Sequence, residues 1–167
     1  MQETVYDPLR RKEVALTPEE RVRQWFIGVL KEEMGVPVHM MMSEVSLTLP
    51  SGKPQRADLV VWNRDGNPLV IVECKRPDVT VDGKVTAQAL RYNNVLNVRY
   101  IIVTSGVATY VFEKAGDRFE PRKALPEWSS MLQPAPEPGQ KPAEQPAAQP
   151  AAQPAPDQPA ETAAEDR

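Results

Sequence analysis

Two apolar runs joined by a short turn constrain the fold of this chain more than any other feature. Residues 56–78 read RADLVVWNRDGNPLVIVECKRPD, in which VVW and LVIV lie on either side of Arg64-Asp65-Gly66-Asn67. Asp-Gly between two such runs is a strong signal for a β-hairpin. Because apolar residues occupy both faces of each run, we expect the hairpin to lie inside a sheet that is covered on both sides.

The turn also predicts which residues face each other across the hairpin. A two-residue loop at Asp65-Gly66 would pair Arg64 with Asn67, and the same register would place Asp58 opposite Glu73. Cross-strand partners have Cβ atoms about 4.5 to 5.5 Å apart, and like charges directly opposite each other are destabilising. The hairpin is therefore expected to carry a penalty that some other group offsets.

A lysine completes this polar patch. Lys75 comes two residues after Glu73 and shares its strand face, whereas Cys74 points to the other face as a small core residue. A hard divalent cation held between Asp58 and Glu73 would offset the repulsion of the two acids. The alternative is a solvated sheet face on which Lys75 neutralises both acids. A pair buried on both faces favours the first interpretation, because a buried acid pair is costly.

The other elements follow from capping and periodicity. Thr17-Pro18-Glu19-Glu20 combines a capping Thr, a Pro at the first helical position and a Glu three residues after the cap, so a helix should begin here and stop at Gly35. The remaining predicted elements are a strand from Ser43, an amphipathic helix over 82–97, and strands over 99–104 and 107–113. This order predicts an α/β domain with a mixed sheet flanked by helices.

The C-terminal segment has a different composition. Nine of the 18 prolines follow Gln133, in a stretch without aromatic residues, Ile or Val, and Ala-Ala-Gln-Pro repeats between Ala147 and Pro154. We therefore predict a disordered tail over 133–167, one domain over 17–132, and a leader over 1–16 with one short strand. The whole chain has a net charge of −3 and the tail has −4, so the rest of the chain carries +1. This charge permits a polyanionic partner for the folded part.

Composition also excludes several classes of protein. One cysteine and one histidine are too few for a disulfide framework or an intrachain structural zinc site, which leaves carboxylates for metal chemistry. The first 20 residues contain no apolar run of signal-peptide length, and no window reaches the roughly 18 apolar residues of a membrane span. A reducing, cytoplasmic compartment is expected, without a membrane.

The polar patch resembles a known signature. Asp58, then 14 residues, then Glu73-Cys74-Lys75 at the end of an apolar strand, is similar to the motif of the PD-(D/E)XK nuclease superfamily. Within it, residues 17 to about 114 most resemble the N-terminal nuclease domain of the type I restriction enzyme R (motor) subunit. The resemblance implies a restriction-endonuclease-like fold and Mg²⁺-dependent hydrolysis of DNA, with Mn²⁺ as a substitute.

The resemblance also implies roles for individual residues. Asp58, Glu73 and the backbone carbonyl of Cys74 would be metal ligands, and Lys75 would be the catalytic lysine. Gln88 and Tyr92 match a Gln-x-x-x-Tyr element that some members carry beside the site.

The chain departs from the family pattern in two ways. Ala57 replaces the proline that names the motif but supplies no ligand. A helicase motor does not fit in the remaining residues, so the resemblance implies nuclease chemistry and not ATP-driven restriction by this chain. We expect DNA as the partner, with a protein partner supplying DNA recognition or a motor.

Other polar residues have two interpretations each. Glu20 resembles a helix acid that some members direct at the metal, but its place in the capping box explains it equally well. Lys84, Gln88 and Arg91 on the second helix would follow DNA phosphates or form a solvated face. Arg56 would touch the scissile strand or pair with Glu73 or Asp58. For the whole domain, the alternative to an enzyme is a non-catalytic module that binds nucleic acid or a partner protein.

The composition of the tail generates a first prediction. A segment that buries no apolar surface should be removable, so a chain that ends near Leu132 should unfold at the same temperature as the full chain and keep any intrinsic activity. Thermal melts of the two proteins test this. A melting temperature lower by more than a few degrees would show that the tail packs on the domain.

Overall fold

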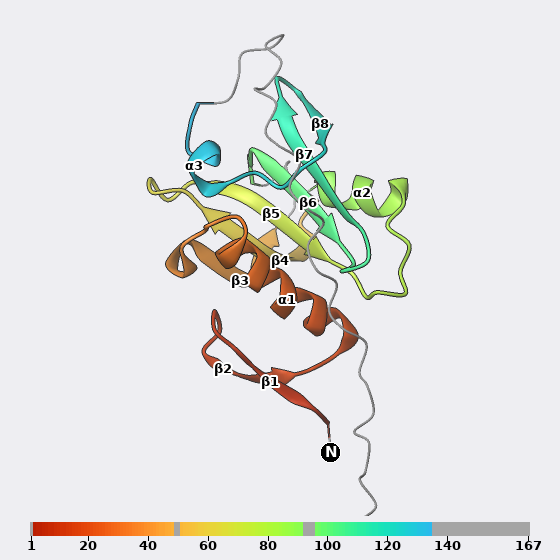
Figure 1. The fold of residues 1–167 in the computed structure, drawn as a ribbon. Coiled ribbons are helices and arrows are strands. Elements are labelled where there is room, and N and C mark those ends of the chain that lie inside the picture. Colours follow the sequence, from red (N-terminus) through yellow and green to blue (C-terminus); the bar gives the residue numbers. More distant parts are fainter. Residues whose placement is uncertain (1, 49–50, 92–95, 135–167) are drawn as a thin grey trace, which may run out of the picture.

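The computed structural model describes residues 2–48, 51–91 and 96–134. The predicted tail from 135 onward, Tyr92 and the side chain of Gln88 lie outside this part. Figure 1 shows a twisted central sheet with helices against it and a small hairpin beside the first helix. The elements, in chain order, are β1 (Thr4–Asp7), β2 (Lys12–Ala15), α1 (Pro18–Glu32), the 3-10 turn η1 (Val38–Met40), β3 (Met41–Thr48), β4 (Pro54–Trp62), β5 (Pro68–Cys74), α2 (Gly83–Leu90), β6 (Tyr100–Thr104), β7 (Thr109–Ala115), β8 (Arg118–Arg122) and α3 (Trp128–Met131).

The main sheet has six strands in the order β3-β4-β5-β6-β7-β8. The pair β5 and β6 is parallel, and the other four pairs are antiparallel. A parallel pair needs a crossover connection, and α2 lies in the connection here. The predicted mixed sheet with flanking helices is confirmed.

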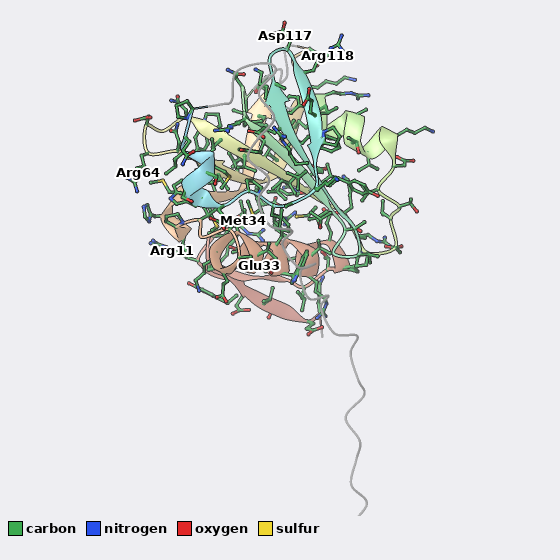
Figure 2. All side chains as sticks on the ribbon, turned by 45° about the horizontal axis from the view of Figure 1, so that its top comes forward. Arg11, Glu33, Met34, Arg64, Asp117 and Arg118 are labelled. Atoms are coloured by element: carbon green, nitrogen blue, oxygen red, sulfur yellow. The ribbon has the colours of Figure 1, made fainter. Side chains whose placement is uncertain are left out.

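The hairpin β4–β5 forms as predicted, but its turn differs. Asn63 closes a longer loop: its carbonyl accepts from Gly66 N at 3.1 Å, and its N–H donates to the Asn67 carbonyl at 2.8 Å. Gly66 takes φ +77°, a left-handed conformation that glycine adopts without strain. Arg64, at the tip, points away from the body (Figure 2).

The longer loop shifts the pairing of β4 with β5 by one residue, and a bulge after the loop restores the predicted register. Trp62 pairs with Pro68, but the register shifts between Val61 and Trp62, so that Leu59 then pairs with Val72. The paired register ends there, one residue before Asp58 and Glu73. The predicted two-residue loop is wrong, but the register next to the two acids is the predicted one, and their direct alignment stays a prediction.

Two apolar clusters cover the two faces of the sheet. Alternate residues of β5 separate between them: Val70 and Val72 pack with Phe26 and Leu30 of α1, whereas Ile71 packs on the other side. The second cluster includes Ala89 of α2. β4 is buried from Ala57 to Val61 and β5 from Leu69 to Cys74, which confirms that this part of the hairpin is covered on both sides.

Three segments differ from the sequence prediction. The leader contains two paired strands, β1 and β2, and not one. The second helix ends at Leu90, and residues 96–99 are not helical, so it is shorter than the predicted 82–97. The strand β8 and the short helix α3 were not predicted, because Pro121 and dense charge hide the alternation of β8.

A buried acid joins the last strands. Glu113 of β7 accepts hydrogen bonds from Arg99 at 2.8 and 2.9 Å and from the Tyr100 hydroxyl at 2.9 Å, and forms an ion pair with Arg122 of β8 at 2.6 Å. Arg99 also donates to the carbonyls of Met131 and Gln133. One carboxylate thus connects β6, β7, β8 and the segment after α3.

Among the helices of the described residues, none combines the length and the apolar composition needed to cross a membrane.

The environment of Glu113 generates a prediction about pH. Burial raises the pKa of Glu113, but the hydrogen bonds from Arg99 and Tyr100 and the nearby arginine charges lower it more, so the net shift is downward. A carboxyl with a lowered folded-state pKa stabilises the fold above its unfolded pKa, about 4.3, and this contribution is lost as pH falls through the folded value. Glu113→Gln should therefore lower the free energy of unfolding at pH 7 by roughly 1 to 3 kcal/mol and flatten its decline below about pH 5.

Urea unfolding of wild type and Glu113→Gln between pH 3 and 7 measures both effects. Glu13→Gln, at an exposed position in β2, is the matched control and should change neither. Equal declines in wild type and Glu113→Gln would assign the acid sensitivity to other carboxylates.

Candidate active site

The structure brings three of the predicted residues together at the end of β5. The side chains of Asp58 and Glu73 are buried, with residue exposures of 7% and 5%. Asp58 Oδ2 accepts from the backbone N–H of Cys74 at 2.7 Å, and Lys75 Nζ donates to Glu73 Oε1 at 2.6 Å. Asp58, the Glu73–Cys74 peptide and Lys75 therefore form one continuous group.

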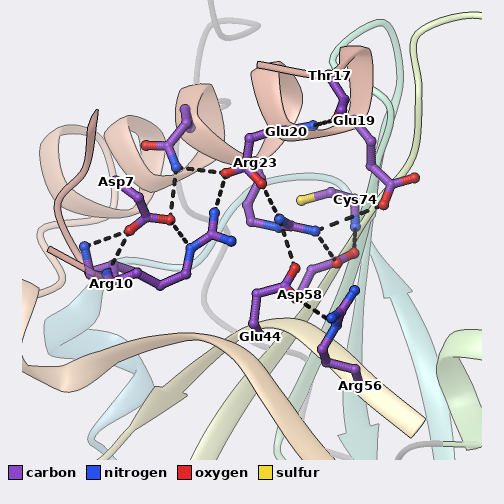
Figure 3. A network of polar contacts seen from close by, with 12 residues as sticks. Asp7, Arg10, Thr17, Glu19, Glu20, Arg23, Glu44, Arg56, Asp58 and Cys74 are labelled. Atoms are coloured by element: carbon purple, nitrogen blue, oxygen red, sulfur yellow. Dashed lines mark hydrogen bonds and ion pairs between the residues drawn. The ribbon is translucent and has the colours of Figure 1, made fainter. Parts of the chain in front are cut away.

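A residue that the sequence analysis did not consider, Arg23 of α1, enters this group. Its Nη2 donates to Asp58 Oδ1 at 2.6 Å, and its Nη1 contacts the carboxylates of Glu20 and Glu44, the latter at 2.8 Å. Figure 3 shows the guanidinium between the helix acid and the sheet acid. The cation next to Asp58 is thus an arginine that reaches across from the first helix.

Glu20 is part of the predicted helix cap by its backbone, while its side chain joins the arginine network. Thr17 caps the helix as expected, because its Oγ1 accepts from Glu20 N at 3.1 Å. The Glu20 carboxylate instead accepts from Arg10 at 2.6 Å and from Gln24 at 2.8 Å, as well as from Arg23. The Thr17 hydroxyl thus accepts from the Glu20 backbone as a capping box predicts, whereas the Glu20 side chain faces Arg10 and Arg23.

The N-terminal hairpin contributes to the same network (Figure 3). Asp7 is fully buried and accepts from Leu9 N at 2.7 Å and from the backbone and side chain of Arg10 at 2.8 and 2.6 Å. Burial raises the pKa of Asp7, but the hydrogen bonds and charge of Arg10 lower it more, so the net shift is downward. The predicted leader is therefore bound to α1 through Arg10 and Glu20.

The strands β3 and β4 are irregular beside Asp58. Glu44 has φ +56°, a conformation that costs a non-glycine residue roughly 1 to 2 kcal/mol, and it forms no ladder pair with Asp58 although the residues on either side remain paired. Leu59 packs under α1, whereas Ala57, two residues earlier, packs with the opposite cluster. This reversal at Glu44 and Asp58 allows the Asp58 carboxylate to reach Arg23. Strained backbone of this kind is concentrated at functional sites.

Charge compensation differs from the sequence expectation. The penalty expected for Asp58 facing Glu73 is offset in this structure by Arg23 on the first acid and Lys75 on the second. The Lys75 part of the alternative interpretation is thus present, but the face is buried and not solvated. Together with the Glu73–Lys75 pair, the ion pairs named above join six acids and four bases. The acids are Asp7, Glu19, Glu20, Glu44, Asp58 and Glu73, and the bases are Arg10, Arg23, Arg56 and Lys75.

Two pKa shifts describe the electrostatics at the end of β5. Burial raises the pKa of the Cys74 thiol well above its ordinary value, and the Asp58 charge adds to this, so Cys74 is a neutral core residue. Burial lowers the pKa of Lys75, but its hydrogen bond to Glu73 and the Glu73 and Asp58 charges raise it more, so the net shift is upward. Lys75 is therefore a cation at neutral pH.

The predicted DNA-binding residues are placed as follows. The Arg56 side chain is 63% exposed, and it pairs with Glu44 at 2.6 Å. Lys84 lies in the first turn of α2 and Arg91 directly after its last residue, and both are exposed. Gln88 belongs to α2 by its backbone, but its side chain, like Tyr92, lies outside the described residues.

The donor atoms at the end of β5 are of the type that binds Mg²⁺, the metal implied by the resemblance. Two carboxylates and a backbone carbonyl are oxygen ligands of the type that Mg²⁺ takes, and each Asp58 oxygen keeps a lone pair beyond the one hydrogen bond given above. Across the described part of the chain, however, no three His, Cys, Asp or Glu side chains are grouped as a metal site. The ligand set implied by the resemblance contains two carboxylate side chains, and Arg23 lies against one of them at Asp58 Oδ1.

The sequence carried a partial signal for Arg23. Arg23 follows Glu19 by four residues and Glu20 by three, the spacing of neighbours on one helix face. It also lies next to Val22 and three residues before Phe26, at the border of the apolar face. Helical spacing could predict the pairs within α1 but not that this face lies against Asp58.

The fold and the site together define a class of protein. A mixed sheet flanked by helices, with Asp58 on one strand and Glu73 and Lys75 at the end of the next, is the nuclease-like arrangement that the sequence motif predicted. The chain belongs to the family described as Type I restriction enzyme R protein N terminus (HSDR_N), which matches residues 18–126.

Two solved structures resemble the chain. One is "the fragment structure of a putative HsdR subunit of a type I restriction enzyme from Vibrio vulnificus YJ016", with a TM-score of 0.55 and 21% identity over 70% of this chain and 24% of that chain. The other is a "putative nuclease belonging to DUF820 from Anabaena variabilis ATCC 29413", with a TM-score of 0.43 and 14% identity over 80% of this chain and 81% of that chain. The first supports the fold. No curated protein sequence matches the chain.

The ion pair between Arg23 and Asp58 generates a prediction about stability. Asp58→Asn keeps the shape of the side chain but leaves the buried Arg23 without one of its carboxylates, so in EDTA at pH 7 the variant should lose roughly 2 to 4 kcal/mol of unfolding free energy. Asp65→Asn, at the exposed turn of the same hairpin, is the matched control and should differ little from wild type. Urea unfolding measures both, and a more stable Asp58→Asn would indicate that repulsion from Glu73 dominates.

Proposed function

We propose that this chain is a Mg²⁺-dependent nuclease domain that hydrolyses DNA phosphodiester bonds, with Mn²⁺ as a substitute. The observation that carries the proposal is the contact of Asp58 with the Cys74 N–H, beside the Lys75–Glu73 pair, at the end of one buried strand. Membership of the R protein N-terminal family supports the same chemistry.

The proposal assigns a role to each of these residues. Asp58, Glu73 and the Cys74 carbonyl would hold the metal, which would polarise the phosphoryl oxygen and lower the pKa of a bound water. Lys75 would position the attacking water or neutralise the charge that develops on the phosphate. The Cys74 N–H donates to Asp58, so one residue, Cys74, would orient one ligand through its N–H and supply another through its carbonyl.

The burial of the two motif acids supports a cation at this place. Asp58 and Glu73 are 7% and 5% exposed at the end of the strand. Buried uncompensated charge is unfavourable. Glu20, the fourth residue assigned to the metal by resemblance, would act through Arg23.

Residues around the site would contact DNA. Arg56, Lys84 and Arg91 are exposed cations that can contact phosphates, and Gln88 and Tyr92 are proposed beside them by resemblance. Substrate recognition is proposed to depend on more than this chain, which spans 24% of the Vibrio vulnificus chain that it resembles. A partner protein would supply DNA recognition or a motor.

A second candidate function has its own supporting observation. Arg23 and Lys75 already pair with Asp58 and Glu73, so the described fold needs no metal to balance these two acids. This favours a module that uses the fold to bind nucleic acid or a partner protein without cleaving. Such a module would bind DNA equally well in Mg²⁺ and in EDTA.

Cleavage assays separate the two functions. Because the two acids and the lysine are proposed to act as a unit, Asp58→Ala, Glu73→Ala and Lys75→Ala should each reduce Mg²⁺-dependent cleavage by at least about 10² to 10³, and double variants should be no worse. The assay uses labelled duplex, single-stranded and branched DNA and RNA, in Mg²⁺ and in EDTA.

Asp65→Ala, at the exposed turn of the same hairpin, serves as the control and should cut like wild type. A Lys75→Ala variant that cuts as well as wild type would contradict the assignment. Binding without cleavage of any substrate would favour the non-catalytic module.

A further inference from the structure

The Arg23 guanidinium divides its contacts between two ends. Nη1 lies against Glu20 and Glu44, whereas Nη2 lies 2.6 Å from Asp58 Oδ1 and 3.8 Å from Glu19 Oε1. The Nη1 end therefore anchors the side chain, and the Nη2 end has two carboxylates within reach. Glu19 precedes Glu20 on α1, and its side chain is 43% exposed, unlike that of Asp58.

Because Arg23 is buried, its position depends on the contacts that its two terminal nitrogens make. Arg23 is 4% exposed, and its Nε is a buried donor with no hydrogen-bond partner. The guanidinium is thus held by its terminal nitrogens alone, and only Nη2 touches a proposed metal ligand. A small rotation about the anchored Nη1 end would move Nη2 from Asp58 toward Glu19, and the guanidinium would stay paired with a carboxylate at both ends.

We propose that Arg23 is a positioning residue that competes with the metal for Asp58 and shifts its Nη2 from Asp58 to Glu19 when the metal binds. This rests on the proposed function. A divalent ion at Asp58 and a guanidinium nitrogen on the same carboxylate repel each other. The metal-free fold would be stabilised by Arg23 in place of the ion, and Glu19 would receive the displaced charge.

The proposal predicts opposite effects of two charge-removing substitutions on metal affinity. Arg23→Gln removes the competitor, so Mn²⁺ should bind more tightly by about 5- to 150-fold, the usual range for coupling between two binding events. Glu19→Gln removes the receiving acid and should weaken Mn²⁺ binding. Damage to the fold alone would weaken binding in both variants, so tighter binding by Arg23→Gln is not a structural side effect.

A double-mutant cycle separates the shift from simple attraction between Glu19 and the metal. If Glu19 acts by receiving Arg23, then Glu19→Gln should have much less effect in the Arg23→Gln background than in wild type. If Glu19 acts only through its charge, the two effects add. Glu33→Gln, an exposed substitution at the end of the same helix, is the control and should leave affinity unchanged (Figure 2).

The experiment is calorimetric titration of the full chain with MnCl₂ for wild type, the single variants and the double variant, with melts in EDTA to verify folding. If Arg23→Gln does not fold, Arg23→Lys replaces it, because a lysine ammonium keeps the charge but cannot bridge Glu20 and Asp58 as a fork, and it too should tighten binding. Unchanged or weaker binding in the folded variant, or additive effects in the cycle, would overturn the proposal.

Failure of the proposed function gives a different result. If neither wild type nor the Arg23 variant binds Mn²⁺ and wild type cuts no substrate, both proposals fail together. If wild type binds Mn²⁺ and cleaves but Arg23→Gln binds no more tightly, only the competition is wrong.

Discussion

The ion pair between Arg23 and Asp58 joins the first helix to the centre of the sheet. It places a guanidinium from α1 against β4 between the buried residues Ala57 and Leu59, and three further carboxylates lie around it. Breaking one partner of such a buried pair is costly because the other charge remains. The same guanidinium contacts Glu44 of β3 and Glu20 of α1, and Glu20 is joined through Arg10 to the N-terminal hairpin (Figure 3).

The network has consequences for function as well as stability. Proteins hold buried acids either with their own cations or with metal ions, and this site has groups for both. Lys75 remains with Glu73 at the strand end, while Arg23 reaches Asp58 from another element. The two acids of the motif are thus held by cations with different freedom to move, since Lys75 belongs to the same chain segment and Arg23 to a helix on the sheet face.

Local sequence patterns predicted much of the fold. The features that were not predicted depend on contacts between distant residues or lack a clear local pattern. The hairpin, the α1 cap and the pairing of Leu59 with Val72 beside the acids depend on residues close in sequence, and these were predicted. Arg23 was missed because its partner on β4 is 35 residues away, and β8 because charge and Pro121 mask its alternation. The assignments of Gln88 and Tyr92 stay predictions, because their side chains lie outside the described part of the chain.

The bulge between Val61 and Trp62 separates the loop of the central hairpin from the alignment of its acids. On the loop side Trp62 pairs with Pro68, and on the site side Leu59 pairs with Val72, next to the two acids. A loop shorter by one residue that also removed the bulge would keep the pairing of Leu59 with Val72. The tip around Arg64 points away from the body and lies beyond the bulge, so it is a suitable place to attach a fluorophore or an affinity tag.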